Sequence, residues 1–214
     1  SQRVHGFQLT DPALMQAQAA CVLADLPVAS IKLGMLGSAE AVRAVFSSLA
    51  AHRQLPVIMD PVLAANSGGS LAQDDLRLAV LAALPAIAVL TPNTLEARLL
   101  ADCEDLDEAV RRLTAAGSHA IWLKGGHEAG EILVNRLYEY GRLTLETRQQ
   151  RLPGEFHGSG CTLAAALAAH LAAGHDLRTA VARTEAYVRA ALLAADRPHA
   201  NGQLLPRRIG LDGY

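Results

Sequence analysis

Aromatic side chains and an excess of either charge are both scarce in this sequence. Phe, Trp and Tyr make up 4% of the 214 residues, and the formal net charge is −2. A chain so close to neutral shows no excess of basic residues suited to binding nucleic acid, and it has no polybasic stretch suited to an anionic membrane surface. Because 51% of the residues are hydrophobic and few are aromatic, the core must consist largely of Ala, Leu, Val and Ile. Such a core suits helices packed closely against a sheet.

Cysteine is also rare. Cys21, Cys103 and Cys161 are widely spaced and form no CxxC pair or Cys/His metal spacing, which argues against a disulfide framework or a zinc site. Free thiols are typical of a reducing cytosol, so we expect a cytoplasmic protein. Pro, Gly or charged residues interrupt the longest apolar stretches, which argues against a membrane span. At this length a single domain is the simplest organisation.

Short apolar segments alternate with helical ones along most of the chain. We expect strands at 28–33, 56–60, 86–90 and 120–124, and helices at 12–26, 39–52, 71–84, 94–101 and 105–116. This alternation predicts an α/β fold with a mainly parallel central sheet flanked by helices on both faces. Residues 132–138 and 143–148 interleave polar positions around Gly141, as in an antiparallel hairpin at the sheet edge. The Ala-rich segments 160–173 and 177–195 are expected to be helices.

Ionisable groups gather where the expected strands end, and ligands of open α/β sheets bind at these carboxyl ends. Asp60 closes one strand and can hold Mg²⁺ on triphosphate oxygens, while Lys124 closes another and can neutralise a transferring phosphate. Glu96 follows Asn93 by three positions, so the two can face one site from a helix start. The alternatives are a solubilising strand-end acid at Asp60 and a helix cap formed by Asn93 and Glu96.

The turn Gly158-Ser159-Gly160 precedes the first of the two C-terminal helices. Glycines allow the backbone to approach a ligand closely, and the amides of a helix start point at the same place. Such a turn suits the charge on a transferring phosphoryl group, although an ordinary loop before a helix is the alternative. Cys161 lies in this turn and can act as a nucleophile or a general base. Its alternative role is that of a small buried hydrophobic residue.

Two common nucleotide motifs are missing. The sequence has no Gly-x-x-x-x-Gly-Lys-Ser/Thr element, and no Gly-x-Gly-x-x-Gly follows an expected strand. A P-loop nucleotidase and a dinucleotide-binding Rossmann enzyme are therefore disfavoured.

Five segments, in this order, carry a resemblance to a known family. They are Ile31-Lys32-Leu33-Gly34-Met35-Leu36-Gly37, Asp60-Pro61-Val62 with Ser67-Gly68, Thr91-Pro92-Asn93 with Glu96, Lys124-Gly125-Gly126-His127, and His157-Gly158-Ser159-Gly160-Cys161-Thr162. Together they resemble the hydroxymethylpyrimidine/phosphomethylpyrimidine kinases of thiamine biosynthesis, within the ribokinase-like superfamily. The resemblance implies a ribokinase-like three-layer sandwich. It also implies phosphoryl transfer from ATP with Mg²⁺, to the hydroxymethyl group of the pyrimidine and then to its monophosphate.

The same resemblance implies roles for the catalytic turn and its neighbours. Cys161 is similar to the family's catalytic residue, which replaces the Asp that sugar kinases use as base. Gly158, Ser159 and Gly160 resemble its anion hole. Lys124 is similar to the lysine that steadies the transferring phosphate.

Further roles concern the metal, the nucleotide and the acceptor. Asp60 and Glu96 resemble the acids around the metal, and we expect Asn93 to contact the nucleotide together with Lys124 and Gly160. Met35 and Val62 resemble residues that line the pyrimidine pocket. Gln2 is matched with a glutamine that hydrogen-bonds the pyrimidine.

The sequence departs from the family pattern in two places. The family's first strand and its Gly-Thr-Asp-Pro-Ser-Gly-Gly-Ala-Gly substrate segment have no counterpart, so we expect one kinase domain over 1–214 that lacks both. Asn66 stands where the family usually has Lys. A pyridoxal-type vitamin kinase and a catalytically silent pyrimidine-binding regulatory domain are the alternative functions. A homodimer is the family's habit and is expected here.

Overall fold

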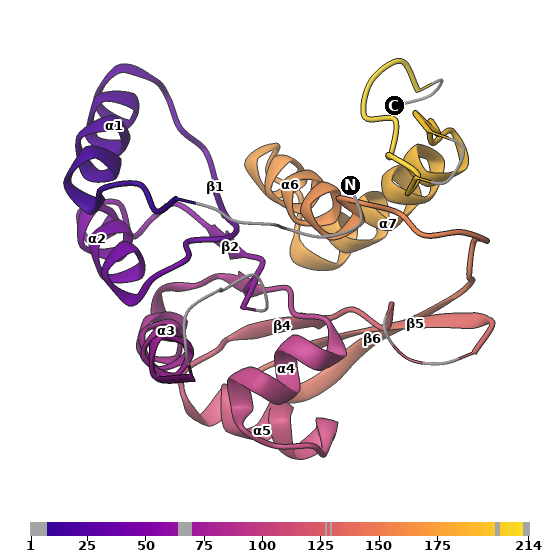
Figure 1. Ribbon diagram of the computed structural model, residues 1–214, viewed down its shortest axis with the longest axis horizontal. Coiled ribbons are helices and arrows are strands. Elements are labelled where there is room, and N and C mark those ends of the chain that lie inside the picture. Colours follow the sequence, from indigo (N-terminus) through magenta and orange to yellow (C-terminus); the bar gives the residue numbers. More distant parts are fainter. Residues whose placement is uncertain (1–7, 64–69, 127, 129, 200–201, 212–214) are drawn as a thin grey trace.

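A six-stranded mixed sheet forms the centre of the molecule in a computed structural model, which describes residues 8–63, 70–126, 128, 130–199 and 202–211 (Figure 1). The strands lie in the order in which the chain makes them. They are β1 (Ile31–Leu33), β2 (Val57–Met59), β3 (Val89–Leu90), β4 (Ala120–Leu123), β5 (Ile132–Glu139) and β6 (Arg142–Gln150). Strands β1 to β4 pair in parallel, whereas β4, β5 and β6 pair antiparallel. The predicted parallel sheet with an antiparallel edge hairpin is therefore confirmed.

Helices cover both faces of this sheet and give three layers. Figure 1 shows α6 and α7 on one side of the sheet and α3, α4 and α5 on the other. The helices are α1 (Pro12–Asp25), α2 (Ala39–Leu49), α3 (Ser70–Ala83), α4 (Thr94–Ala101), α5 (Leu106–Ala115), α6 (Ser159–Ala172) and α7 (Leu177–Leu193), with a short 3₁₀ turn at Leu84–Ala86. None of the helices in the described part of the chain has the length and apolarity needed to cross a bilayer.

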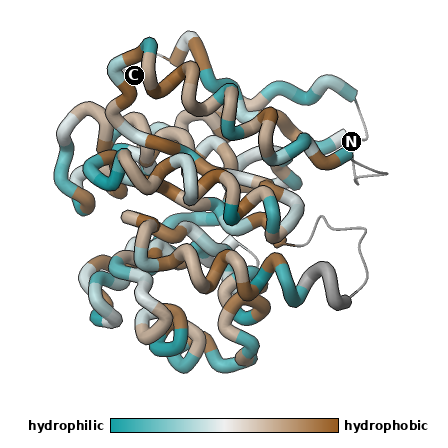
Figure 2. Tube along the Cα trace, turned by 90° about the vertical axis from the view of Figure 1, so that its left-hand side faces the viewer, coloured by the Kyte–Doolittle hydropathy of each residue, from teal (hydrophilic) through white to brown (hydrophobic). Residues whose placement is uncertain are grey.

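The two faces of the sheet bury separate clusters of side chains. Successive residues of a strand point to opposite faces, so neighbours such as Ile121 and Trp122 on β4 enter different clusters. The cluster of Ile121 contains residues of α2 to α5, while that of Trp122 contains residues of α6 and α7. Hydrophobic and hydrophilic positions alternate along the helices, as expected when one helix face lies on a core (Figure 2).

Most helices begin where the sequence places a capping side chain. Ser38 accepts a hydrogen bond from the Ala41 N–H at 3.1 Å, and Asp11 accepts one from the Ala13 N–H at 2.7 Å. These oxygens satisfy amides that have no partner inside the helix, which fixes the starting residue. Strand β1 is shorter than the expected 28–33, since the Val28 N–H donates to Leu26 O within a turn.

Candidate active site

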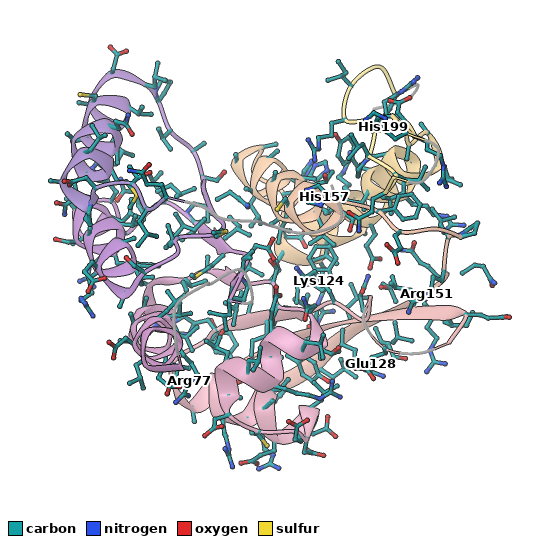
Figure 3. All side chains as sticks on the ribbon, in the orientation of Figure 1. Arg77, Lys124, Glu128, Arg151, His157 and His199 are labelled. Carbon is teal, nitrogen blue, oxygen red and sulfur yellow. The ribbon has the colours of Figure 1, made fainter. Side chains whose placement is uncertain are left out.

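A cavity of about 740 Å³ lies at the carboxyl edge of the parallel strands, between the sheet, the hairpin and the helices α6 and α7. Most of the residues that the sequence singled out line this cavity: Asp60, Asn93, Glu96, Lys124, Gly158, Ser159, Gly160 and Cys161. They come from four separate segments of the chain, which the sheet brings to one place. Lys124 lies near the centre of the molecule in Figure 3, with Arg151 and Glu128 on the hairpin side.

Lys124 is held between two carboxylates. Its Nζ donates to Asp60 Oδ1 at 2.6 Å and lies 4.0 Å from Glu96 Oε2. The side chains of Lys124, Asp60 and Glu96 are 12%, 4% and 13% exposed, so protein groups rather than water surround all three. The interpretation of Asp60 as a solubilising strand-end acid is therefore wrong.

Glu96 has two tasks in the structure. Asn93 Oδ1 accepts from the Glu96 N–H, and Glu96 Oε2 accepts from the Asn93 N–H, both at 2.8 Å. This capping box starts α4, so the interpretation of Asn93 and Glu96 as a helix cap is confirmed. The same carboxyl faces Lys124, so capping and facing the cavity do not exclude each other here.

Burial raises the pKa of the Glu96 carboxyl above its ordinary value. The Lys124 ammonium and the hydrogen bond from the Asn93 N–H both lower this pKa, and the Asp60 carboxylate raises it. The effect of desolvation on the pKa of this largely buried acid is therefore larger than the opposing effect of the nearby Lys124 ammonium.

The start of α6 lies directly against the Lys124–Asp60 pair. Gly158 is its N-cap, with a left-handed φ of 82° that a glycine adopts without strain. A Cβ added to Gly160 would lie 3.3 Å from Lys124 Nζ and 3.7 Å from Asp60 Oδ2. The backbone amides of the turn are therefore close to both charged groups. Cys161 is exposed, so its interpretation as a buried hydrophobic residue is wrong.

The structure does not bring every predicted residue to the cavity. Met35 is 42% exposed and Val62 is half-buried; they follow β1 and β2 without lining the cavity with the others. Their contact with the pyrimidine stays a prediction. Gln2 and Asn66 lie outside the described residues, as do Ser67, Gly68 and His127.

Arg151, which the sequence did not single out, clamps the loop after Lys124. Its Nη1 donates to Gly126 O at 2.7 Å, its Nη2 to Glu128 O at 2.7 Å and its Nε to Gly130 O at 3.0 Å. The planar guanidinium thus uses all three of its nitrogens on one stretch of backbone. No local sequence pattern reveals such a contact, because it joins the end of β6 to a loop about twenty positions earlier.

Asn135 on β5 and Glu185 on α7 also line the cavity without having been predicted. A sequence signal did exist for Glu185. It lies between Val181 and Val188 at helical spacing, on the inner face of α7, where an acid is unexpected.

The C-terminal segment returns to the same turn. The Arg208 Nε donates to Thr162 Oγ1 at 3.0 Å, and that hydroxyl donates to Gly158 O at 2.8 Å. Leu204 pairs with Phe156 in an isolated bridge and accepts from the His157 N–H at 2.9 Å. Leu204 and Arg208 therefore hold the backbone on the two sides of Gly158.

A mainly parallel α/β sheet whose carboxyl edge combines a glycine-rich helix start, a buried lysine and two acids defines a class of α/β phosphotransferases. Within this class the chain belongs to the phosphomethylpyrimidine kinase family, whose sequence model matches residues 1–204.

Similar proteins come from several bacteria. The hydroxymethylpyrimidine/phosphomethylpyrimidine kinases of Rhizobium meliloti and Synechococcus elongatus are 36% and 40% identical to this chain; the matches cover 86% and 85% of this chain and 71% of each relative. The thiamine biosynthesis bifunctional protein ThiED of Geobacter sulfurreducens is 36% identical over 90% of this chain and 40% of that protein. The chain thus spans less than half of that bifunctional relative.

Solved structures share the fold. An ADP complex of Bacillus subtilis pyridoxal kinase has a TM-score of 0.83 at 23% identity, over 93% of this chain and 77% of that one. The phosphomethylpyrimidine kinase of Clostridium difficile 630 has a TM-score of 0.66 at 24% identity, over 84% of this chain and 76% of that one. These likenesses confirm the predicted fold class.

Proposed function

We propose that this chain transfers the γ-phosphoryl group of ATP to 4-amino-5-hydroxymethyl-2-methylpyrimidine and to its monophosphate, in thiamine biosynthesis. The observation that carries the proposal is the juxtaposition of Lys124, bound by Asp60, with the turn at Gly160 in one cavity. Family membership and the names of the bacterial relatives supply the acceptor.

Phosphoryl transfer depends on positioning and on electrostatic stabilisation of the charge on the moving group. The N–H groups at the start of α6 and the Lys124 ammonium would meet that charge from two sides. Cys161 would accept the proton of the hydroxymethyl group as its oxygen bonds to the γ-phosphorus and the bond to the ADP oxygen breaks. Its exposed position beside the turn suits a group that must reach an incoming substrate.

Asp60 and Glu96 fit a magnesium ion that accompanies the nucleotide. Kinase sites hold Mg²⁺ through one or two carboxylates plus phosphate oxygens, where the ion neutralises charge on the phosphates. Asp60 Oδ1 binds Lys124, while Oδ2 lies 3.7 Å from a Cβ added at Gly160 and so faces the turn. Glu96 accepts the Asn93 N–H through Oε2 in the helix cap, and its carboxyl lines the same cavity.

We expect Asp60→Asn to weaken the response to Mg²⁺, because an amide oxygen replaces one carboxylate charge at this position. Titration of turnover with Mg²⁺ at saturating ATP should show half-activation at about tenfold higher metal concentration. Glu155→Gln, which changes another acid that lines the cavity, is the matched control. An unaltered titration in Asp60→Asn would remove Asp60 from the metal.

The acceptor is tested by measuring ATP consumption side by side with hydroxymethylpyrimidine, its monophosphate and pyridoxal. Turnover of the two pyrimidines, with little on pyridoxal, is the expected result. Preference for pyridoxal would mark a pyridoxal-type kinase instead. Pyrimidine binding without ATP consumption would mark a catalytically silent regulatory domain, and either outcome overturns the proposal.

We also propose that the protein works as a homodimer in the cytoplasm, where its three free cysteines stay reduced. Light scattering coupled to size exclusion measures the assembly directly, and a monomer at working concentration would contradict the dimer.

A further inference from the structure

Glu185 is a buried acid on the inner face of α7. The residue is 8% exposed and lines the cavity of the candidate site. Its Oε1 accepts hydrogen bonds from Asn135 Nδ2 at 2.8 Å and from Thr147 Oγ1 at 2.5 Å. Both partners are neutral donors, one on β5 and one on β6. Burying a carboxyl costs free energy, and these two hydrogen bonds offset that cost.

Asn135 relays this contact to the turn after β4. The residue is 5% exposed, and its Oδ1 accepts from the Gly125 N–H at 3.1 Å. An amide side chain can exchange its oxygen and nitrogen by rotating half a turn. Because Oε1 of Glu185 accepts the hydrogen bond, Nδ2 is held toward α7 and Oδ1 is held toward Gly125. Glu185 therefore decides which way round the Asn135 amide lies.

Gly125 is the residue directly after Lys124, and its backbone is in close contact with β5. A Cβ added at Gly125 would lie 2.1 Å from Val134 O. On the preceding side, the Lys124 N–H donates to Pro92 O at 2.9 Å. The main chain of Lys124 is thus held on one side by Pro92 and on the other by Asn135 through Gly125. From this fixed backbone the ammonium reaches Asp60.

We propose that Glu185 and Asn135 are a positioning pair, which fixes the Gly125 N–H and thereby the direction in which Lys124 presents its ammonium to the transferring phosphoryl group. The proposal rests on the phosphoryl transfer proposed above. The two residues act through Gly125, with Lys124 as the group that meets the phosphate. Since the position of Lys124 matters most in the transition state, disturbing the pair should lower kcat more than it raises the KM for ATP.

The first test exchanges the acid and the amide. Asn135→Asp keeps an acceptor for Gly125 but sets two carboxyls against each other, and we expect kcat to fall by about tenfold or more. The double variant Asn135→Asp/Glu185→Gln restores a donor opposite an acceptor and keeps an oxygen for the Gly125 N–H. We expect its kcat to return to within about threefold of the wild type.

Thr147→Val is the matched control for stability. It removes the other hydrogen bond to the same Glu185 oxygen but leaves Asn135 and Gly125 in contact. We expect its kcat to stay within about twofold of the wild type, even where its melting temperature falls as far as that of Asn135→Asp. Equal loss of kcat in both variants, or a double variant no faster than Asn135→Asp, would assign the network to stability alone and overturn the proposal.

A second readout needs no turnover. In Glu185→Leu the Asn135 amide loses its acceptor, so hydrogen exchange of the Gly125 amide, followed by NMR in the ligand-free chain, should accelerate by about tenfold relative to Thr147→Val. Unchanged exchange would overturn the pair. If the wild type phosphorylates neither the pyrimidines nor pyridoxal, the proposed function fails. Hydrogen exchange of the Gly125 amide still tests, independently of turnover, whether Glu185 and Asn135 hold this turn.

Discussion

Because the thiol of Cys161 is exposed, a substitution there should change turnover and leave the stability of the fold almost unchanged. In Cys161→Ala we expect the free energy of unfolding to change by no more than about 0.5 kcal/mol, since an exposed side chain contributes little packing. Turnover should fall by about 100-fold or more, because the proton of the acceptor hydroxyl loses its base. Urea unfolding and an assay of ADP release measure the two quantities.

Cys21→Ala is the matched control, since Cys21 is also exposed but lies on α1, outside the cavity. Both its stability and its turnover should equal those of the wild type. Unchanged turnover in Cys161→Ala would remove Cys161 from the chemistry.

The raised pKa of Glu96 has a consequence for stability. The folded state takes up the Glu96 proton at higher pH than the unfolded chain, where the ordinary value is 4.5. The contribution of Glu96 is therefore fully present below that ordinary pKa and is lost as pH rises through the raised pKa. Glu96→Gln keeps a capping box and removes the titration, so the variant should gain stability relative to the wild type as pH rises.

Urea unfolding from about pH 4 to about pH 7 measures this difference for the wild type and Glu96→Gln together. A constant difference across this range would contradict the raised pKa. Glu104→Gln, which removes an acid outside the cavity, is the control for the loss of a carboxyl group elsewhere.

At the scale of residues, the sequence predicted the groups at strand ends better than the groups behind them. Asp60, Glu96 and Lys124 each follow a short apolar segment, and the carboxyl ends of parallel strands must share an edge. Glu185 and Asn135 are fifty positions apart and meet only after α7 packs against the sheet. Their pairing depends on tertiary contacts, which no local pattern encodes.

At the scale of elements, the start of α6 has a glycine at a position where alanine would make the helix more stable but would crowd Lys124. Gly160 is the second residue of that helix, where Ala is intrinsically favoured by about 0.5–1 kcal/mol. A Cβ there would intrude on Lys124 Nζ at 3.3 Å. We expect Gly160→Ala to melt at the same temperature as the wild type or higher, while turnover falls by about tenfold or more.

Gly174→Ala supplies the opposite case. Gly174 follows α6 with a φ of +84° and has nothing within 4 Å of an added Cβ. Its substitution should cost about 1 kcal/mol of stability through backbone strain and leave kcat unchanged. Full activity in Gly160→Ala would show that the helix start does not meet the phosphates closely.

Element types were predictable from the sequence, but their lengths were not. The alternation of apolar segments and helices gave the order of the strands, and interleaved polar residues marked the hairpin β5–β6. Strand β3 spans only Val89–Leu90 rather than the expected 86–90, because residues 84–86 continue α3 as a 3₁₀ turn. A strand ends where its hydrogen bonds to the neighbouring strand end, and the length of that neighbour depends on tertiary packing.

At the scale of the whole molecule, the C-terminal segment closes one wall of the cavity. Leu204 holds the backbone of Glu155 and His157, and Arg208 reaches Thr162. We expect a chain that ends at Gly202 to bind ATP about fivefold or more weakly, since residues 155–157 lose their partners. Isothermal titration with ATP measures the change.

A chain that ends at Leu211 keeps every one of these contacts and should bind ATP as the wild type does. Equal affinity in both shortened chains would contradict a role of the C-terminal segment in the cavity wall.

The turn after Lys124 also limits how the sequence can drift. A side chain at position 125 would collide with Val134 O at 2.1 Å, and that backbone atom belongs to a paired strand which cannot move aside. At position 126 a Cβ would meet only the tip of Leu133 at 3.9 Å. The two adjacent glycines therefore differ in how well they tolerate substitution. Position 125 accepts only glycine, while position 126 can accept small side chains and can therefore vary without loss of the fold.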